Sequence, residues 1–363
     1  MNILHTETLK RWGGQQNKVL KEMLTARDLG HDCFLICNPG SEIARRAKRN
    51  GFHVTELSMH KKNFHQTIPF FLKYIREHQI DTVISHGSTD SWIVAVAGNL
   101  SRQRPYLLRE RHNLFPIKGY LSRLQHRKMF DRILVLGSSV RNYLESIGVA
   151  SERCFLLPST VDIDHFVRTT PSLRREYHIP EDAVVVGVLT SLIEAKGVFD
   201  FFEAVKILLG RYPSLYVVFG GNYSERTRES IERYFEDRPR EKARIVWTGF
   251  VRDPATVMKD LDIFLFPSHT EGLGTVILEA MAAKLPVIVY DQEPMNILVR
   301  NGINGFTCPF RDHNCLADKA GILIDDPQLR KAMGEKSFEY VRANYSDDTL
   351  KRRIHELLES IDA

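Results

Sequence analysis

Short apolar runs alternate with longer amphipathic segments along most of the chain, and this pattern constrains the fold more than any other feature. Examples are AVVVGVL at residues 183–189, IFLFPS at 263–268 and VIVY at 287–290. Buried parallel strands joined by helical crossovers produce this alternation. We therefore expect an α/β protein, and the pattern excludes an all-α or an all-β fold.

The alternation is interrupted at residues 158–182, which hold three prolines and many polar residues. Such a stretch indicates a connection between domains. We predict an N-terminal Rossmann-like domain at 1–165, a C-terminal one at 166–340, and a final helix at 341–363 that packs back towards the N-terminal domain. Open parallel sheets bind ligands beyond the carboxyl ends of their strands, so the two domains are expected to face each other across a ligand-binding cleft.

The positive charge is concentrated in the first half of the chain. Residues 1–165 carry 24 Lys and Arg against 15 Asp and Glu, within a total net charge of +5. This imbalance favours an anionic partner such as a phosphate, an acidic glycan or an anionic lipid, although a solvated face would give the same count. Aromatic residues are not interleaved with the basic ones, so we do not expect a nucleic-acid partner.

Targeting and cysteine signals indicate a cytoplasmic protein. The first residues lack a long apolar segment, and no run approaches the ~18 apolar residues of a membrane span. The five scattered cysteines (Cys33, Cys37, Cys154, Cys308 and Cys315) are predicted to be reduced thiols. The basic segment at 119–130, GYLSRLQHRKMF, is either a solvated helix or a peripheral contact with the anionic inner face of the membrane.

A glycine-containing loop follows the apolar run at 263–268 and precedes a predicted helix from Thr275. Glycines let a backbone approach a ligand closely, and the amides of a helix N-terminus suit a phosphate. The amides of Gly272, Leu273, Gly274 and Thr275 are therefore a candidate phosphate cradle.

Two glutamates flank that cradle, Glu271 in the loop and Glu279 in the helix. Carboxylates can accept hydrogen bonds from pairs of hydroxyl groups on a sugar and on a ribose, and a sugar nucleotide presents both around a diphosphate. Two glutamates at this spacing are more often solvated when no such loop accompanies them.

The stretch PSHTEGLGTVILEAMAAKLPV at 267–287 resembles the donor-binding signature of the family-4 retaining glycosyltransferases, which have the GT-B fold of two Rossmann-like domains. The resemblance covers most of the chain. It implies that Glu271 contacts the transferred sugar, that Glu279 contacts the ribose, and that the 272–275 amides hold the phosphates. It implies a nucleotide-sugar co-substrate and no cofactor. We favour a UDP-sugar over a GDP-sugar.

Other positions match this family less closely. Gly13 and Gly14 follow the first apolar run, where the family has a glycine loop near the donor phosphate, and Lys196 lies where a family lysine neutralises the diphosphate. Ser191 replaces a usual arginine, so Arg109 or Arg111 is a candidate to supply that charge. Glu293 and Pro294 replace two glycines that touch the donor sugar in the family.

On the acceptor side, His112 lies where related enzymes carry a histidine at the reacting sugar. We infer catalytic roles for His112, Lys196 and Glu271, and acceptor-side roles for His86, Asp90, Arg109 and Arg111. The pairing of HGSTDSW at 86–92 with RERH at 109–112 resembles transferases of lipopolysaccharide and surface-polysaccharide assembly.

No metal is expected. Asp162 and Asp164, like Asp260 and Asp262, form an Asp-x-Asp pair, but neither pair follows a strand at a glycine loop. The expected function is transfer of a sugar from a nucleotide sugar to a glycan or glycolipid acceptor with retention of configuration. The alternatives are a sugar-nucleotide epimerase, a sugar-phosphate synthase, or a non-catalytic subunit that only binds.

Overall fold

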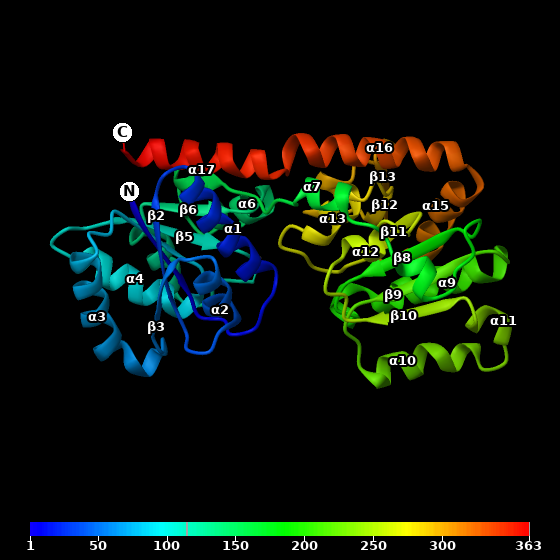
Figure 1. The fold of residues 1–363 in the computed structure, drawn as a ribbon, viewed down its shortest axis with the longest axis horizontal. Helices are drawn as coiled ribbons and strands as arrows, with labels where there is room; N and C mark the ends of the chain where they lie inside the picture. The colour runs from blue at the N-terminus through cyan, green and yellow to red at the C-terminus, as the bar shows by residue number, and fades with distance from the viewer. Residues whose placement is uncertain (114, 363) are drawn as a thin grey trace. The chain divides into compact units, whose positions relative to one another are not determined.

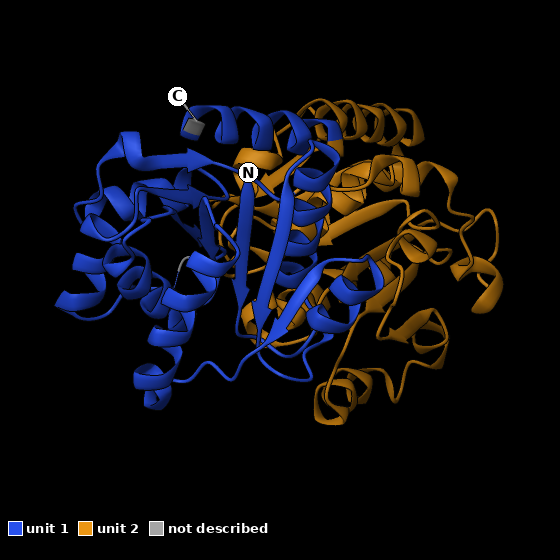
Figure 2. Cartoon of the chain, turned by 60° about the vertical axis from the view of Figure 1, so that its left-hand side comes forward, with its two compact units in different colours: residues 1–159, 348–363 blue, residues 160–347 orange. Residues whose placement is uncertain are grey.

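A computed structural model describes residues 1–113 and 115–362 of the chain. The chain divides into two compact units, which Figure 2 colours separately: unit 1 comprises residues 1–159 and 348–363, and unit 2 comprises residues 160–347. Each unit holds one open sheet whose paired strands are all parallel. The predicted α/β class is therefore confirmed.

The sheet of unit 1 has seven strands in the order β3-β2-β1-β4-β5-β6-β7. Figure 1 labels β2, β3, β5 and β6 among them. The strands are β1 (Asn2–Glu7), β2 (Asp32–Cys37), β3 (His53–Glu56), β4 (Thr82–Ser85), β5 (Tyr106–Arg111), β6 (Arg132–Val135) and β7 (Cys154–Leu156). The helices are α1 (Gly14–Asp28), α2 (Glu42–Arg49), α3 (Phe64–Glu77), α4 (Ser88–Leu100), α5 (Tyr120–Lys128), α6 (Ser138–Ser146) and α17 (Asp347–Asp362), with short 3-10 turns η1 (Lys61–Asn63) and η2 (Ser151–Arg153).

The sheet of unit 2 has six strands in the order β10-β9-β8-β11-β12-β13. These are β8 (Val185–Leu189), β9 (Tyr216–Gly220), β10 (Ile245–Gly249), β11 (Ile263–Phe266), β12 (Val287–Tyr290) and β13 (Gly305–Cys308). Its longer helices are α9 (Val198–Arg211), α10 (Glu225–Glu232), α13 (Thr275–Ala282), α15 (His313–Asp325) and α16 (Pro327–Asn344). Its shorter ones are α7 (Ile163–Arg168), α8 (Leu173–Glu176), η3 (Glu194–Lys196), η4 (Arg233–Phe235), α11 (Pro239–Lys242), α12 (Ala255–Met258) and α14 (Met295–Leu298).

The final helix, α17, supplies part of the core of unit 1. Its buried apolar side chains belong to the same hydrophobic cluster as residues of β1 and α1: Leu350, Ile354, Leu357 and Leu358 pack with Ile3, Val19 and Leu20. An apolar stripe along one side of a helix is stable in water only when other side chains cover it. Residues of β1 and α1 cover the apolar stripe of α17. The chain therefore enters unit 1 twice.

The stretch at 158–182 contains two short helices, α7 and α8. The carboxylate of Asp162 accepts a hydrogen bond from the His165 amide and so caps α7. Two other aspartates also bind backbone amides. The Asp260 carboxylate accepts a hydrogen bond from the Arg174 amide, and the Asp262 carboxylate accepts one from the Val185 amide. All three aspartates are committed to the architecture of unit 2.

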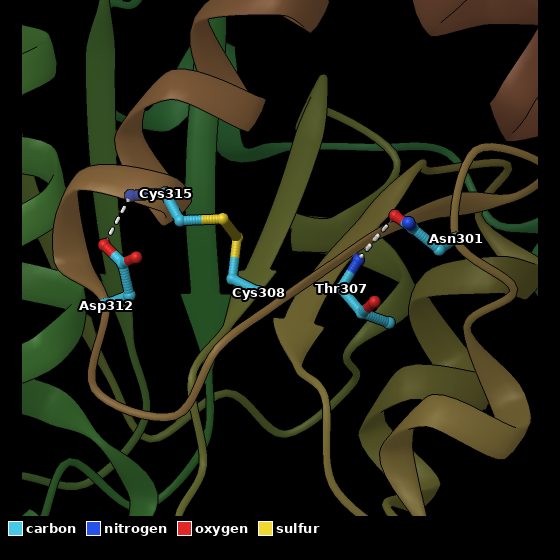
Figure 3. The surroundings of a disulfide bond; sticks show 5 residues. All are labelled: Asn301, Thr307, Cys308, Asp312 and Cys315. Carbon is cyan, nitrogen blue, oxygen red and sulfur yellow. Dashed lines mark hydrogen bonds between the residues drawn. A yellow bond between two sulfur atoms is a disulfide. The ribbon is translucent and has the colours of Figure 1, made fainter.

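The expectation that all five cysteines are reduced is wrong for two of them. Cys308, at the end of β13, forms a disulfide with Cys315 in the first turn of α15 (Figure 3). The turn between them folds back because the Asp312 carboxylate accepts the Cys315 amide and caps α15. A separation of seven residues carries no sequence signal for this pairing. The remaining cysteines, Cys33, Cys37 and Cys154, are buried free thiols.

Candidate active site

The topology of each sheet marks the edge at which a ligand is expected. Strand order reverses between β1 and β4 in unit 1, and between β8 and β11 in unit 2. Open parallel sheets bind ligands where the order reverses, beyond the carboxyl ends of the strands. The loops that follow these four strands carry most of the residues predicted from sequence.

In unit 2, Lys196 and Glu271 form an ion pair. The Lys196 Nζ lies 2.6 Å from Glu271 Oε1, and the two side chains are 28% and 12% exposed. The hydroxyl of Ser268, which is fully buried, donates to the same carboxylate oxygen at 3.0 Å. Two residues that are 75 positions apart in sequence are thereby brought together at the carboxyl edge of the sheet.

Close backbone packing holds these two loops together. Gly197 has a φ of +70°, and a Cβ at this position would lie 1.9 Å from the carbonyl oxygen of Pro267. Only glycine fits such a contact. The His269 amide also donates to the Ala195 carbonyl at 3.1 Å. The backbone therefore fixes the position of Lys196 relative to the Glu271 loop.

The predicted phosphate cradle lies at the start of α13. Gly274 has a φ of +82°, a left-handed conformation that favours glycine, and α13 begins at the next residue. The first amides of a helix have no partner within the helix and carry its positive dipole end. Glu279 lies in the second turn of α13 and is half-buried.

Sequence reasoning missed the polar layer behind this loop. The His269 Nε2 lies 2.7 Å from the Asp200 carboxylate, and Tyr290 donates to the same carboxylate at 2.9 Å. The Gln292 amide donates to the backbone carbonyls of Ser268 and His269. These contacts orient the loop that carries Glu271. They join residues from three separate elements, which a linear motif does not reveal.

In unit 1, Glu110 on β5 is the centre of a buried charged cluster. Its side chain is fully buried, with Lys18 Nζ at 2.5 Å and His86 Nδ1 at 3.0 Å. His112 Nε2 lies 3.7 Å from the same carboxylate and 3.1 Å from His86 Nδ1. Burial would raise the pKa of Glu110, but Lys18 and the two histidines outweigh burial and hold this pKa well below its usual value.

The neighbouring histidines differ in the direction of their pKa shifts. Burial would lower the pKa of His86, but the hydrogen bond and charge of Glu110 outweigh it and raise the pKa. Burial lowers the pKa of His112 to about 3 and places the pKa of His5 well below its usual value. His86 lies between the other two histidines, with His5 Nδ1 at 3.1 Å from its Nε2 and His112 Nε2 at 3.1 Å from its Nδ1.

Two overlapping groups in this cluster could hold a metal by the nature of their ligand atoms: His5, Glu22 and His86, and His86, Glu110 and His112. Lys18, however, pairs with both Glu22 and Glu110. The lysine ammonium already supplies the positive charge that these carboxylates require, and a cation beside it would be repelled. The cluster is therefore best described as an ion network in which Lys18 neutralises the glutamates.

A cavity of about 410 Å³ opens beside this network, and the residues that line it all belong to unit 1. His86, Arg109 and Arg111 line it, whereas His112 and Asp90 are not among its lining residues. Asp90 is fully buried, and its carboxylate accepts the amides of His86 and Gly87 at 3.0 Å. Asp90 therefore positions the start of α4 and, with it, His86.

The glycine loop of unit 1 lies at the start of α1. Gly13 is the N-cap residue and Gly14 the first helical residue, and both are exposed. No side chain of a described residue caps this end of the helix. The next residue, Gln15, donates to the Glu7 carboxylate at 2.8 Å and lines the cavity.

Comparison with known proteins identifies the class to which this fold and these loops belong. Residues 12–165 match the family model Glycosyltransferase Family 4, and residues 169–340 match Glycosyl transferases group 1. The two models together account for both Rossmann-like sheets. The chain belongs to the glycosyltransferases that these models describe, and the predicted family is confirmed.

Individual relatives agree with this assignment. The chain is 24% identical over 291 residues to the capsular polysaccharide biosynthesis glycosyltransferase CapM of Staphylococcus aureus, with 76% of each protein covered. Several other curated glycosyltransferases align over about half of their own length. A glycosyltransferase structure from Rickettsia africae covers 99% of this chain and 98% of its own, with a TM-score of 0.90 at 18% identity.

The structure of Anabaena HepE in complex with UDP and glucose covers 99% of this chain and all of its own, with a TM-score of 0.84 at 18% identity. At this identity the likeness concerns the fold, which confirms the predicted GT-B architecture of two Rossmann-like domains. Among the described residues, no helix combines the length and the apolar character needed to cross a bilayer.

Proposed function

We propose that the protein transfers a sugar from a UDP-sugar to a hydroxyl group of a glycan or glycolipid acceptor, with retention of configuration, in surface-polysaccharide or lipopolysaccharide assembly. Unit 2 binds the donor and unit 1 binds the acceptor. The observation that carries the proposal is the Lys196 to Glu271 ion pair, held beside the amides of α13 where strand order reverses. Family membership and the UDP-bound structural neighbour support it.

In the proposed reaction, the bond between the anomeric carbon and the diphosphate breaks, and the acceptor oxygen bonds to that carbon on the same face. The acceptor proton passes to the departing phosphate oxygen. Negative charge develops on the diphosphate, and the Lys196 ammonium and the first amides of α13 are suited to stabilise it. Catalysis would come mainly from positioning and from this charge stabilisation.

The two glutamates divide the recognition of the donor in this proposal. Glu271 contacts hydroxyls of the transferred sugar, and Glu279 contacts the ribose hydroxyls. Glu271 already accepts from Lys196 and Ser268, so its carboxylate is held in place before a sugar arrives. Preorganisation of this kind reduces the ordering cost of binding.

Donor binding is tested by calorimetry of the full chain with UDP, GDP and ADP, first without and then with Mg²⁺ or Mn²⁺. We expect UDP to bind without metal and Glu279→Ala to weaken it at least tenfold. Glu229→Ala, on an exposed position of α10, is the matched control and should bind UDP as the wild type does. Equal UDP affinity of Glu279→Ala and wild type would contradict the assignment of the donor site.

The reaction itself is tested by the anomeric configuration of the product, read by proton NMR. A product with the donor configuration supports retention, and an inverted product contradicts it. Conversion of the UDP-sugar without any acceptor would indicate the epimerase instead. Nucleotide binding without any turnover across an acceptor panel would indicate a subunit that only binds.

A membrane contact is proposed for the rim of unit 1. Phe115, Tyr120 and Leu121 are 70%, 74% and 66% exposed, and Lys118, also exposed, lies among them. Aromatic side chains next to basic ones suit the headgroup region of an anionic leaflet. Sedimentation with vesicles should show binding to anionic and not to neutral lipid, and Tyr120→Ser with Leu121→Ser should abolish it. Equal sedimentation with both lipids would refute this contact.

A further inference from the structure

The cavity of unit 1 is lined by buried polar groups that have no hydrogen-bond partner among the described residues. It lies beyond the carboxyl ends of β1, β4 and β5 and beside α5. Buried polar groups in proteins are nearly always hydrogen-bonded, so a cluster of exceptions that lines one cavity marks a candidate binding site. Four of the cavity's lining residues carry such atoms: Arg109, Arg111, Gln125 and His126.

The two arginines are the strongest part of this observation. Arg109 and Arg111 are 5% and 9% exposed, and neither forms an ion pair with a described residue. Arg109 Nη1 donates to the Ser85 carbonyl at 2.9 Å, and Arg111 Nη2 donates to the Phe115 carbonyl at 2.8 Å. The Nε atom of each guanidinium group is buried and has no partner among the described residues.

Two unpaired guanidinium groups in one buried site are unfavourable by themselves. Removing a charge from water costs several kcal/mol unless an opposite charge compensates for it. Burial lowers the pKa of Arg109 to about 10 and also lowers the pKa of Arg111, in the direction that this cost requires. Of the nearby carboxylates, Glu110 pairs with Lys18, and Asp90 accepts backbone amides through Oδ2. The negative charge of Asp90 offsets only part of the effect of burial on the pKa of Arg109.

Helix α5 adds neutral groups on the same cavity. Gln125 Nε2 is a buried donor without a partner among the described residues. The His126 Nδ1 lies 2.7 Å from the Ser122 carbonyl, so Nδ1 carries the proton and the unpartnered Nε2 offers a lone pair. A lone pair of this kind suits a hydroxyl group. The cavity therefore combines cationic donors with an acceptor for a sugar hydroxyl.

We propose that this cavity binds an oxyanion of the acceptor substrate, a phosphate ester or a carboxylate on a sugar, through Arg109, Arg111 and Gln125. His126 accepts a hydrogen bond from a hydroxyl group of the same sugar. A volume of about 410 Å³ lies within the usual range for sites of small ligands. The inference rests on the proposed function, because it specifies which acceptors the transferase would take.

The test is calorimetry on the full chain, saturated with UDP, with four probes: inorganic phosphate, glucose 6-phosphate, glucuronate and glucose. We expect at least one anionic probe to bind ten times more tightly than glucose. Glucose 6-phosphate and glucuronate distinguish a phosphate from a carboxylate. Arg109→Gln and Arg111→Gln should each weaken the anion at least tenfold and leave UDP affinity within twofold of the wild type.

Arg76→Gln, an exposed position on α3 with the same change of charge, is the matched control and should bind every probe as the wild type does. Gln125→Met tests the site without removing a charge, in case an arginine variant does not fold, and should weaken the anion severalfold. Failure of every anion to bind better than glucose would overturn the inference, as would unchanged affinity in Arg109→Gln, Arg111→Gln and Gln125→Met.

Two further outcomes separate this inference from the proposed function. If the arginine variants lose UDP affinity as strongly as anion affinity, the arginines serve the donor diphosphate, and the acceptor assignment is overturned. If the wild type does not bind UDP at all, the proposed function fails, whereas selective binding of an anion by the arginines would still establish the site.

Discussion

The two units place charged residues at equivalent edges of their sheets but hold them in different ways. In unit 2, Lys196 and Glu271 are partly exposed, and their loops are locked by a glycine contact with the Pro267 backbone. In unit 1, Lys18 and Glu110 are almost completely buried and fixed by each other. An exposed pair can exchange its partner for a ligand at little cost, whereas a buried pair is part of the fold. We therefore expect the Lys196 and Glu271 pair to serve the proposed chemistry and the Lys18 and Glu110 pair to serve the architecture of unit 1.

The largest expected effect is the loss of the buried lysine. Lys18→Met leaves the Glu22 and Glu110 carboxylates without their cation, and removal of one partner of a buried pair costs about 3–5 kcal/mol. Urea denaturation in a Trp247→Phe background leaves Trp12 and Trp92, both in unit 1, as the fluorescent probes. Only a decrease of this size in the free energy of unfolding would support the architectural role.

Its control is the exposed pair Lys73 and Glu77 on α3, which has the same i,i+4 spacing as Lys18 and Glu22. Lys73→Met should change the free energy of unfolding by less than about 0.5 kcal/mol. If the two lysine variants were equally stable, burial would not be what distinguishes the pairs.

Lys196→Ala should have the opposite effect: a large loss of activity and a small loss of stability. Loss of one group that stabilises developing negative charge lowers kcat by about 10²- to 10³-fold, while stability should fall by less than about 1 kcal/mol because the pair is partly exposed. Transfer assays and denaturation on the same preparation measure both. Lys336→Ala, from an exposed pair with Glu339, is the control and should keep full activity. A stability loss as large as that of Lys18→Met would remove the contrast between the units.

The disulfide adds a covalent constraint to unit 2. Cys308→Ser with Cys315→Ser should destabilise the protein by roughly 2 kcal/mol, because the closed loop is short and the loop-closure entropy grows slowly with length. The measurement is the unfolding midpoint in a Trp12→Phe, Trp92→Phe background, in which Trp247 of unit 2 is the remaining tryptophan. An unchanged midpoint in the double variant, with the wild type fully oxidised, would show that the bond does not stabilise unit 2.

The smallest effect concerns pH and unit 1. Because burial lowers the pKa of His112 to about 3, the folded protein keeps this side chain neutral, while the unfolded chain takes up its proton below about pH 6.5. Stability should therefore fall on acidification from pH 6.5 towards pH 3. Between pH 7.5 and pH 5 the wild type should lose roughly 1–2 kcal/mol more than His112→Gln. Parallel stability profiles of the two proteins would rule out a buried neutral His112.

The difference between the unit 2 loop and the buried network of unit 1 also decides what could be predicted from the sequence. The proposed donor loop is contiguous in the sequence, so the order of strand, glycines and helix from Ile263 to Ala282 could be recognised directly. The network of unit 1 joins Lys18 on α1 to Glu110 on β5, 92 positions later, and no local pattern encodes such a pair. A signal was present nonetheless, because Glu110 and the two arginines interrupt the apolar run of a central strand. Charges at such positions have to be paired or have to bind a ligand.

The segment at 119–130 illustrates a second limit. Its basic residues indicated a surface helix, and α5 does expose Tyr120 and Leu121. The same helix buries Gln125 and His126 against the cavity. Both are polar, so hydropathy could not identify the buried face. That face can be recognised only in the fold, where α5 and β5 line the same cavity.

The return of α17 to unit 1 has a consequence for how the protein is made. A ribosome completes residues 1–159 long before it reaches the helix that covers their apolar face, because the 188 residues of unit 2 lie between. At about 5–20 residues per second, this interval lasts roughly 10–40 s. During that time the nascent first half of the molecule presents the uncovered β1 to α1 face to the cell. Completion of the unit 1 core therefore waits until α17 has been synthesised.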